Sequence, residues 1–174
     1  MVTPDEPNLV VVVVEDDAET RANLCDILEL DGLVVRSAGT FTECMAHKHG
    51  SPMAVILDCQ LPDGTADQMI PHLKSAWPEA AIVVVTGYPD IDGAIACLRQ
   101  GASDYLLKPV NPDALRSTVA RIVEARRAAV TMRQRKAHLS SILNTAVDAI
   151  ITIDHQGMIT GTNPATESLF GYAR

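Results

Sequence analysis

The sequence predicts a doubly wound α/β domain, in which helices cover both faces of a parallel sheet. Three apolar runs rich in β-branched residues, Val10–Val14, Ala54–Leu57 and Ile82–Val85, have the composition of strands buried on both faces. Stretches with helical spacing fill the intervals between them, and each run ends in a polar residue. Strands that alternate with helices in this way are typical of α/β folds.

Each predicted helix ends at a recognisable stop signal. Apolar residues three or four positions apart mark three such helices: Leu24, Ile27 and Leu28 before Asp31-Gly32; Ile70, Leu73 and Trp77 before Pro78; Ile91, Ile95 and Leu98 before Gly101. Asp17 follows the first strand, and we expect it to cap the first helix rather than to bind a ligand.

Polar residues at the strand ends predict a single site. These residues are Glu15, Asp16, Asp58, Thr86 and Lys108. Ligands of doubly wound folds bind outside the carboxyl ends of the strands, so we expect these side chains to gather there. Two carboxylates about 4 Å apart repel each other by roughly 1 to 4 kcal/mol, so three of them require a cation or raised pKa values.

The residue types at this site suit phosphoryl transfer. Oxygen ligands completed by water favour Mg²⁺, which is usually held by one or two carboxylates beside a phosphate. Asp58 then has the chemistry of a nucleophile that accepts a phosphoryl group. The metal ion, Lys108 and Thr86 would stabilise charge on the transferred oxygens.

Four ordered segments resemble the receiver domain of response regulators in two-component signalling. They read VVVVEDDAETR, VILDCQLPDG, VVVTGY and GASDYLLKPV, and the resemblance covers roughly residues 8 to 128. It implies a flavodoxin-like sheet of five parallel strands in the order 2-1-3-4-5. Asp58 resembles the phosphoacceptor, and Glu15 and Asp16 resemble the metal-binding acidic pair. A backbone carbonyl at Gln60 would supply a third metal contact.

The resemblance also implies a conformational switch. Thr86 resembles the hydroxyl that turns toward the phosphoryl group, and Tyr105 the aromatic residue that moves inward with it. Lys108 resembles the ion-pair partner of the acceptor, and its bond to Pro109 is implied to be cis. The sequence departs from the family at two places. Glu15 replaces the more usual aspartate, and Thr65 and Ala66 stand where the family often has an acidic or small residue followed by glycine.

The implied phosphoryl donor is a histidine kinase or a phosphotransfer protein. A degenerate receiver that acts only as a docking or dimerisation module is the first alternative. The second is a haloacid-dehalogenase-like, Mg²⁺-dependent phosphatase, whose nucleophile follows the first strand with an acid two residues later. Asp58 follows the third predicted strand and has Gln60 at that position, which argues against a phosphatase.

Composition limits the remaining classes. The chain has 174 residues, 47% of them hydrophobic, and a net charge of −8, which is enough for one domain and part of another. No apolar run approaches the length of about 20 residues that a membrane span needs, and the first residues lack a signal-peptide pattern, so we expect a cytoplasmic protein. The four cysteines form no CxxC pair and are expected to be buried or half-buried.

Charge changes sign near residue 121. Residues 1–120 contain 7 Lys/Arg and 18 Asp/Glu, a balance of −11, whereas residues 121–136 contain six basic residues and only Glu124. Asn111-Pro112 is a helix start, and one helix is predicted from there to about Asn144. Without a helix-turn-helix or aromatic partners, this basic stretch does not predict nucleic-acid binding.

The same helix carries a weak heptad pattern. The first core position of the heptad is occupied by Leu115, Ile122, Ala129, Lys136 and Leu143. The second is occupied by Thr118, Ala125, Met132, Leu139 and Ala146. This pattern is compatible with a parallel homodimeric coiled coil. A receiver helix that packs on its own sheet and continues into an exposed basic linker explains it equally well.

The C-terminal segment resembles the start of a PAS sensory domain. We predict a helix, a strand at Ile150–Ile153, a turn, a strand at Met158–Thr162 and a helix from Asn163 in the segment ILNTAVDAIITIDHQGMITGTNPATESLFGY. We therefore expect a receiver at residues 1–128, a helical linker at 129–145 and the N-terminal part of a PAS domain at 146–174. A receiver followed by PAS implies a longer signalling protein, such as a hybrid sensor histidine kinase.

Overall fold

The computed structural model describes residues 9–46, 50–87 and 91–171 and divides into two compact units, Met1–Arg127 and Ala128–Arg174. The elements, in chain order, are β1 (Val10–Val14), α1 (Ala18–Leu30), β2 (Val34–Ala38), α2 (Phe41–Ala46), β3 (Ala54–Asp58), β4 (Gln60–Leu61), β5 (Gly64–Thr65), α3 (Ala66–Ala76), β6 (Ala81–Thr86), α4 (Ile91–Arg99), β7 (Asp104–Leu107), α5 (Pro112–Thr145), β8 (Ile151–Ile153), β9 (Ile159–Thr162) and α6 (Pro164–Phe170).

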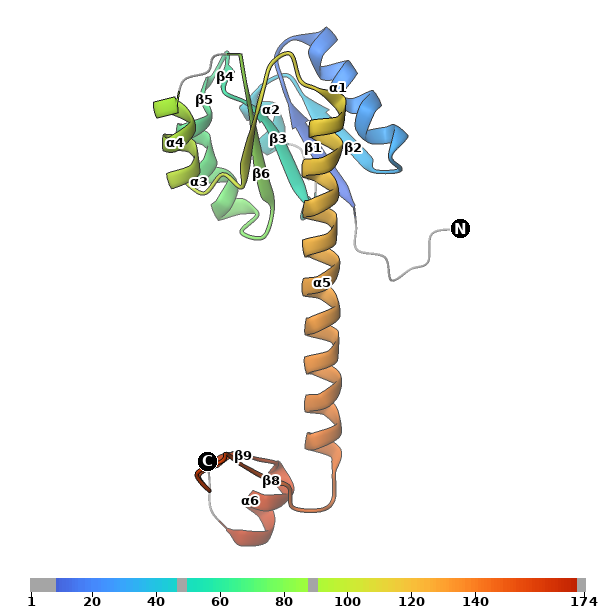
Figure 1. Ribbon diagram of the computed structural model, residues 1–174, viewed down its shortest axis with the longest axis vertical. Coiled ribbons are helices and arrows are strands. Elements are labelled where there is room, and N and C mark those ends of the chain that lie inside the picture. Colours follow the sequence, from blue (N-terminus) through green and yellow to red (C-terminus); the bar gives the residue numbers. More distant parts are fainter. Residues whose placement is uncertain (1–8, 47–49, 88–90, 172–174) are drawn as a thin grey trace. The chain divides into compact units, whose positions relative to one another are not determined.

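Five parallel strands form the sheet of the first unit, in the order β2-β1-β3-β6-β7. Strands β4 and β5 form a separate small hairpin outside this sheet, so β6 and β7 are its fourth and fifth strands along the chain. The predicted order 2-1-3-4-5 is therefore confirmed. All five residues of β1 and all five of β3 are buried, which explains the apolar sequence of β1 and of β3 up to Asp58. Figure 1 shows these strands at the centre of the unit.

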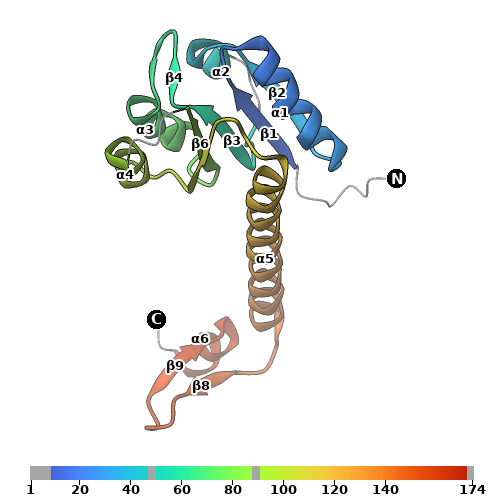
Figure 2. The same ribbon diagram turned by 45° about the horizontal axis from the view of Figure 1, so that its top comes forward.

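Helices cover both faces of the sheet, as the doubly wound prediction requires. On one face, Val11, Val13 and Ile56 pack with α1 and with the start of α5. On the other face, Val12, Val55 and their neighbours pack with residues of α2, α3 and α4. Figure 2 shows α1 and α3 on opposite sides of the strands. With both faces covered, functional groups of the sheet are accessible only at its ends.

Helix α5 begins where the sequence predicts and packs first on its own sheet. The side chain of Asn111 accepts hydrogen bonds from the backbone N–H groups of Asp113 and Ala114, at 2.8 and 3.2 Å. Leu115, Thr118 and Val119 are buried in the first unit. The first residues of the heptad pattern, Leu115 and Thr118, are therefore already buried against the sheet of the same chain. In the part of the chain that is described, no helix is both long enough and apolar enough to cross a membrane.

The second unit contains the rest of α5, the antiparallel pair β8 and β9, and α6. The predicted order of helix, strand, turn, strand and helix is confirmed. Asn163, the N-cap of α6, is buried, and its amide donates hydrogen bonds to the carbonyl oxygens of Leu143 and Asp148 at 3.2 and 2.9 Å. Its side-chain oxygen accepts from the N–H of Ile150 at 2.8 Å, so a single side chain joins these segments of the unit.

Candidate functional site

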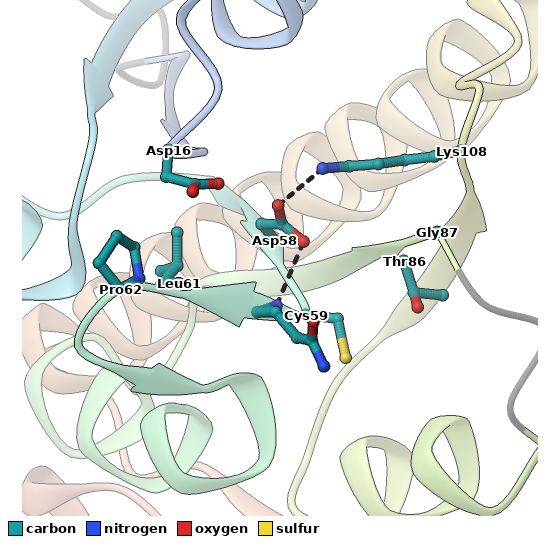
Figure 3. Close-up of a pocket in the computed structure, with 9 residues that line it drawn as sticks. Asp16, Asp58, Cys59, Leu61, Pro62, Thr86, Gly87 and Lys108 are labelled. Atoms are coloured by element: carbon teal, nitrogen blue, oxygen red, sulfur yellow. Dashed lines mark hydrogen bonds and ion pairs between the residues drawn. The ribbon is translucent and has the colours of Figure 1, made fainter.

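The carboxyl ends of four parallel strands bring the predicted site residues to one edge of the sheet. Glu15 and Asp16 follow β1, Asp58 ends β3, Thr86 ends β6 and Lys108 follows β7. A pocket at this edge is lined by Asp16, Asp58, Cys59, Gln60, Leu61, Pro62, Thr86, Gly87 and Lys108. Figure 3 shows Asp58 between Asp16 and the Lys108 side chain, which reaches across from β7.

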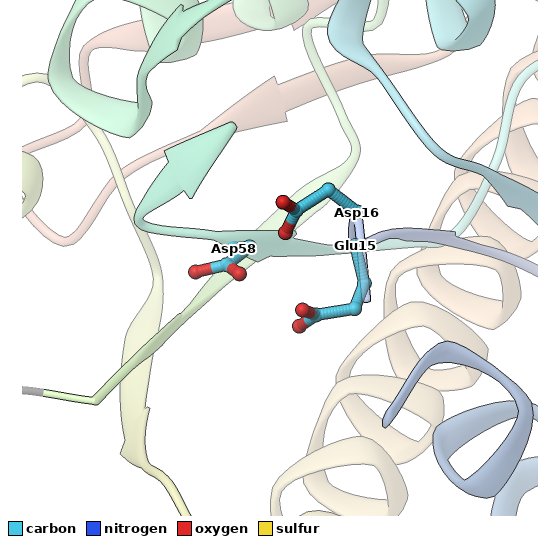
Figure 4. Close-up of side chains that lie close together, drawn as sticks. All are labelled: Glu15, Asp16 and Asp58. Carbon is cyan, nitrogen blue, oxygen red and sulfur yellow. The ribbon is translucent and has the colours of Figure 1, made fainter. Parts of the chain in front are cut away.

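Three carboxylates converge beside this pocket. Glu15, Asp16 and Asp58 each offer one oxygen atom, and these atoms all lie within 4.8 Å of one another (Figure 4). Glu15 and Asp58 are buried, with exposed fractions of 1% and 7%, whereas Asp16 is exposed. The cluster therefore has two oxygen donors inside the protein and one that opens to solvent.

Lys108 forms ion pairs with both buried carboxylates. Its Nζ donates hydrogen bonds to Asp58 Oδ2 at 2.6 Å and to Glu15 Oε1 at 2.8 Å. Partial burial by itself lowers the pKa of Lys108, but the hydrogen bonds to Asp58 and Glu15 outweigh it, so this pKa is raised. Burial raises the pKa of Glu15, and the nearby Asp58 adds to that effect, while Lys108 opposes it.

The cluster has the charge and the donor atoms for a hard divalent cation. Three carboxylates face the single ammonium group of Lys108, which leaves negative charge in excess when all are ionised. Glu15 Oε2 is buried and lies 2.7 Å from Nζ of Lys108, which is shared with Asp58. Carboxylate oxygens of this kind are the ligands that Mg²⁺ prefers.

The loop after Asp58 is tied back to the acceptor. The N–H of Gln60 donates to Asp58 Oδ1 at 3.2 Å, and the N–H of Ala66 donates to the carbonyl oxygen of Cys59 at 3.0 Å. Gln60 and Thr65 then pair in the β4-β5 hairpin. Gln60 is thus held at the pocket by its backbone, at the position where the resemblance implies a carbonyl ligand.

The two switch candidates lie on neighbouring strands. Thr86 is half-buried and lines the pocket, and Figure 3 shows its side chain pointing away from the Asp58 carboxylate. Tyr105 is 44% exposed, on β7. The Lys108-Pro109 peptide bond is cis, as the resemblance implies.

Two residues that hold the site in place were not predicted from the sequence. The guanidinium of Arg21 donates to the carbonyl oxygens of Glu15 and Asp16. The carboxylate of Asp63 accepts from the N–H groups of Phe41 and Thr42, at 3.1 and 2.8 Å, at the start of α2. Asp63 precedes a glycine and therefore has the sequence signal of an ordinary turn residue, which does not reveal a partner 21 residues away.

The cysteines have the burial that the sequence predicts. Cys25 and Cys59 are half-buried, and Cys44 and Cys97 are buried. Burial raises the pKa of both Cys44 and Cys97 to about 11, so their thiols remain protonated at neutral pH. Cys59 lines the pocket beside the acceptor.

Comparison with known sequences identifies two families along the chain. The model of the response regulator receiver domain matches residues 11–120, and the model of the PAS fold matches residues 137–174. Regulatory protein LuxO of Vibrio vulnificus is 33% identical over 108 residues, which are 62% of this chain and 24% of LuxO. Response regulator protein FleR of Pseudomonas aeruginosa is 35% identical over 114 residues, 64% of this chain and 24% of FleR. The chain thus spans about a quarter of these relatives.

Solved structures share the fold of the first unit. A CheY-like receiver domain from Methanospirillum hungatei superposes with a TM-score of 0.66 at 25% identity, over 71% of this chain and 99% of that one. The receiver domain of NtrX from Brucella abortus gives 0.62 at 27% identity, over 66% and 98%. The BeF₃-activated receiver domain of DrrB gives 0.63 at 25% identity, over 68% and 99%.

Proposed function

The chain belongs to the response-regulator receiver family, and from that premise we propose that Asp58 accepts a phosphoryl group from a phosphohistidine. The observation that carries the proposal is the ion-paired cluster at the strand ends. Lys108 lies 2.6 Å from Asp58, and Glu15 and Asp16 offer oxygens beside it. The donor is a histidine kinase or a phosphotransfer protein.

The side chains divide the work of this transfer. One carboxylate oxygen of Asp58 attacks phosphorus, forming an acyl phosphate as the P–N bond of the donor breaks and the electron pair stays on the imidazole, which takes up a proton. Lys108, whose raised pKa keeps it protonated, moves its hydrogen bond to an oxygen of the transferred group. Thr86 supplies its hydroxyl to a second oxygen after the side chain turns toward the pocket.

Glu15, Asp16, Asp58 and the carbonyl of Gln60 would hold Mg²⁺. Bound there, the ion neutralises charge on the phosphoryl oxygens. Asp16 is the exposed member of the cluster, and we assign it direct contact with the ion. Glu15, besides its place among the metal-binding residues, would hold the ammonium group of Lys108 beside Asp58 through its ion pair.

The proposed output runs through α5. Rotation of Thr86 and inward movement of Tyr105 would change the surface of β7, and with it the start of α5, which packs in the same unit. We assign residues 1–128 to the receiver, 129–145 to a helical linker and 146–174 to the first part of a PAS domain. We propose a cytoplasmic hybrid histidine kinase, or a similar signalling protein, as the whole molecule.

The phosphoacceptor assignment is tested by intact-mass analysis after incubation with acetyl phosphate and Mg²⁺. We expect the wild-type chain to gain one phosphoryl group and Asp58→Asn to gain none. Asp26→Asn, which removes an exposed carboxylate of α1, is the matched control and should still be modified. If wild type remains unmodified and also fails to bind beryllofluoride, the receiver is a docking module.

We also propose that two copies associate through the exposed part of α5. Met132, Leu139 and Leu143 are 67%, 60% and 40% exposed, and heptad spacing puts them on one stripe of the helix. Lys136 lies on the same stripe, and a lysine at such a position fixes register at a cost in stability. Sedimentation of the chain should show a dimer that is lost when the three apolar residues become glutamine. Alanine at Gln134, His138 and Ser141, on the opposite stripe, should leave the dimer intact, whereas equal effects of the two triple variants would contradict the proposal.

A further inference from the structure

The guanidinium of Arg21 lies against the backbone of the acidic pair. Its Nη1 donates to the carbonyl oxygen of Glu15 at 2.5 Å and to that of Asp16 at 3.1 Å. Arg21 itself is in α1, one turn after the N-cap, and its own N–H donates to the carbonyl oxygen of Asp17 at 2.9 Å. The arginine therefore folds back over the loop that carries both acidic side chains.

This loop has one anchor at each end. At its start, the N–H of Glu15 donates to the carbonyl oxygen of Ala38 at 3.1 Å, which extends the pairing of β1 with β2. At its end, Asp17 caps α1 by accepting from the N–H of Thr20 at 2.7 Å. Arg21 joins the two carbonyl groups between these anchors, where the strand has ended and the helix has not begun. Its contacts fix the peptide planes on either side of Asp16.

A glycine leaves room for the guanidinium in this position. A Cβ atom at Gly39 would lie 3.4 Å from Nη1 of Arg21 and 3.7 Å from Oε2 of Glu43. The same Oε2 accepts from the N–H of Gly39 at 2.7 Å. The φ angle of Gly39 is not in the left-handed region, so its backbone tolerates a larger residue. A side chain larger than methyl at this position would contact both the guanidinium of Arg21 and the carboxylate of Glu43.

We propose that Arg21 is a positioning residue for the metal and acceptor site, an inference that rests on the proposed function. Its hydrogen bonds hold the backbone of Glu15 and Asp16 so that their carboxylates face Asp58 before a divalent cation binds. Asp16 depends on this most, because its side chain is exposed. The role acts through backbone geometry, so it exists in the metal-free protein.

Two measurements on the chain test this role. Calorimetric titration with Mg²⁺ reports affinity, and amide hydrogen exchange without metal reports the loop. We expect Arg21→Met to weaken Mg²⁺ binding roughly three- to tenfold, as the loss of one or two backbone hydrogen bonds allows, and to speed exchange at Asp16 and Asp17. Arg21→Lys should recover part of both. Arg36→Met, which removes an equal charge from an exposed residue of β2, should change neither.

Gly39→Val extends the test without removing a charge or a ligand. We expect weaker Mg²⁺ binding and faster exchange at Asp16 with Arg21 still present. The proposal is overturned if Arg21→Met binds Mg²⁺ like wild type, or if exchange rises equally throughout β1 and α1, which would indicate a general role in stability. Failure of wild type to bind Mg²⁺ would instead overturn the proposed metal site itself.

Discussion

Lys108 stabilises the folded protein by compensating two buried carboxylates, so its removal should be costly. The change is Lys108→Met, which keeps most of the side-chain length and removes the ammonium. In wild type, Nζ lies 2.6 Å from Asp58 Oδ2 and 2.7 Å from Glu15 Oε2. Without it, Glu15 and Asp58, which are 1% and 7% exposed, face each other and Asp16 without a cation.

The size of the effect follows from these distances and from exposure. At about 2.7 Å and an effective dielectric of about 20, each ion pair has a gross Coulomb energy of roughly 6 kcal/mol, most of which desolvation offsets. Loss of one partner from a buried pair costs about 3 to 5 kcal/mol. The Lys108 side chain is 25% exposed, and water that enters its place screens the carboxylates. We therefore expect a loss of about 2 to 4 kcal/mol in the free energy of unfolding at pH 7.

The loss should depend on pH in one direction. The pKa of Lys108 is raised from its ordinary value of 10.5, so its contribution is fully present below pH 10.5 and is lost only as pH rises through the folded pKa. Burial already raises the pKa of Glu15 from 4.5, and removal of Lys108 should raise it further. Below that pKa the carboxyl is neutral and no longer needs a cation. The difference between wild type and variant should therefore shrink as the pH falls from 7 toward 4.5, the ordinary pKa of a glutamate.

Urea unfolding followed by tryptophan fluorescence measures this difference. Trp77 is the single tryptophan of the chain and is half-buried in the first unit, so it reports on that unit alone. Lys74→Met is the matched control, because Lys74 Nζ donates to the carbonyl oxygen of Ala80 at 2.9 Å and pairs with no carboxylate of the described residues. A second change, Glu15→Gln, should recover part of the stability of Lys108→Met. Equal losses in the two lysine variants, or a loss that stays constant with pH, would refute the reasoning.

Three further predictions concern the surroundings of the site. Asp63→Ala should lower the free energy of unfolding by about 1 kcal/mol, because α2 loses its cap. Burial opposes ionisation of Asp63, but the hydrogen bonds from Thr42 outweigh it and lower the pKa of Asp63. In urea titrations of wild type, this contribution should therefore be lost only at pH below 3.8. Alkylation of native protein at pH 8 should spare Cys44 and Cys97, whose pKa is about 11, as peptide mapping will show; rapid labelling of either would contradict their burial. Ile56→Ala in β3 should cost about 2 to 5 kcal/mol in the same unfolding assay, and a loss below that of Asp63→Ala would contradict the packing of α1 and α5 on this face of the sheet.

The sequence revealed the central strands more clearly than the edges. Strands β1, β3 and β6 are buried on both faces and therefore have continuous apolar sequences. Strand β2 is an edge strand, and Val34 at its start is 53% exposed, so its composition carries no comparable pattern. Strand β7 alternates between half-buried and exposed residues. The order of all five strands came from the family resemblance and not from periodicity.

Short elements that depend on distant contacts could not be predicted from the sequence. Helix α2 has only six residues and is capped by Asp63 from another loop. The β4-β5 hairpin has two residues in each strand. Among the site residues, the strand-end rule brought Glu15 and Asp58 together. It did not reveal that Lys108 pairs with Glu15 as well as with Asp58, because that contact depends on side-chain reach across the sheet.

The central claim, that Asp58 is the residue which accepts the phosphoryl group, is tested most directly by locating the modified carboxylate. The chain is incubated with acetyl phosphate and Mg²⁺ and then treated with borohydride, which reduces an aspartyl phosphate to homoserine. Peptide sequencing by tandem mass spectrometry should place homoserine at residue 58 and nowhere else. Homoserine at Asp16, or at several aspartates with none at Asp58, would contradict the account.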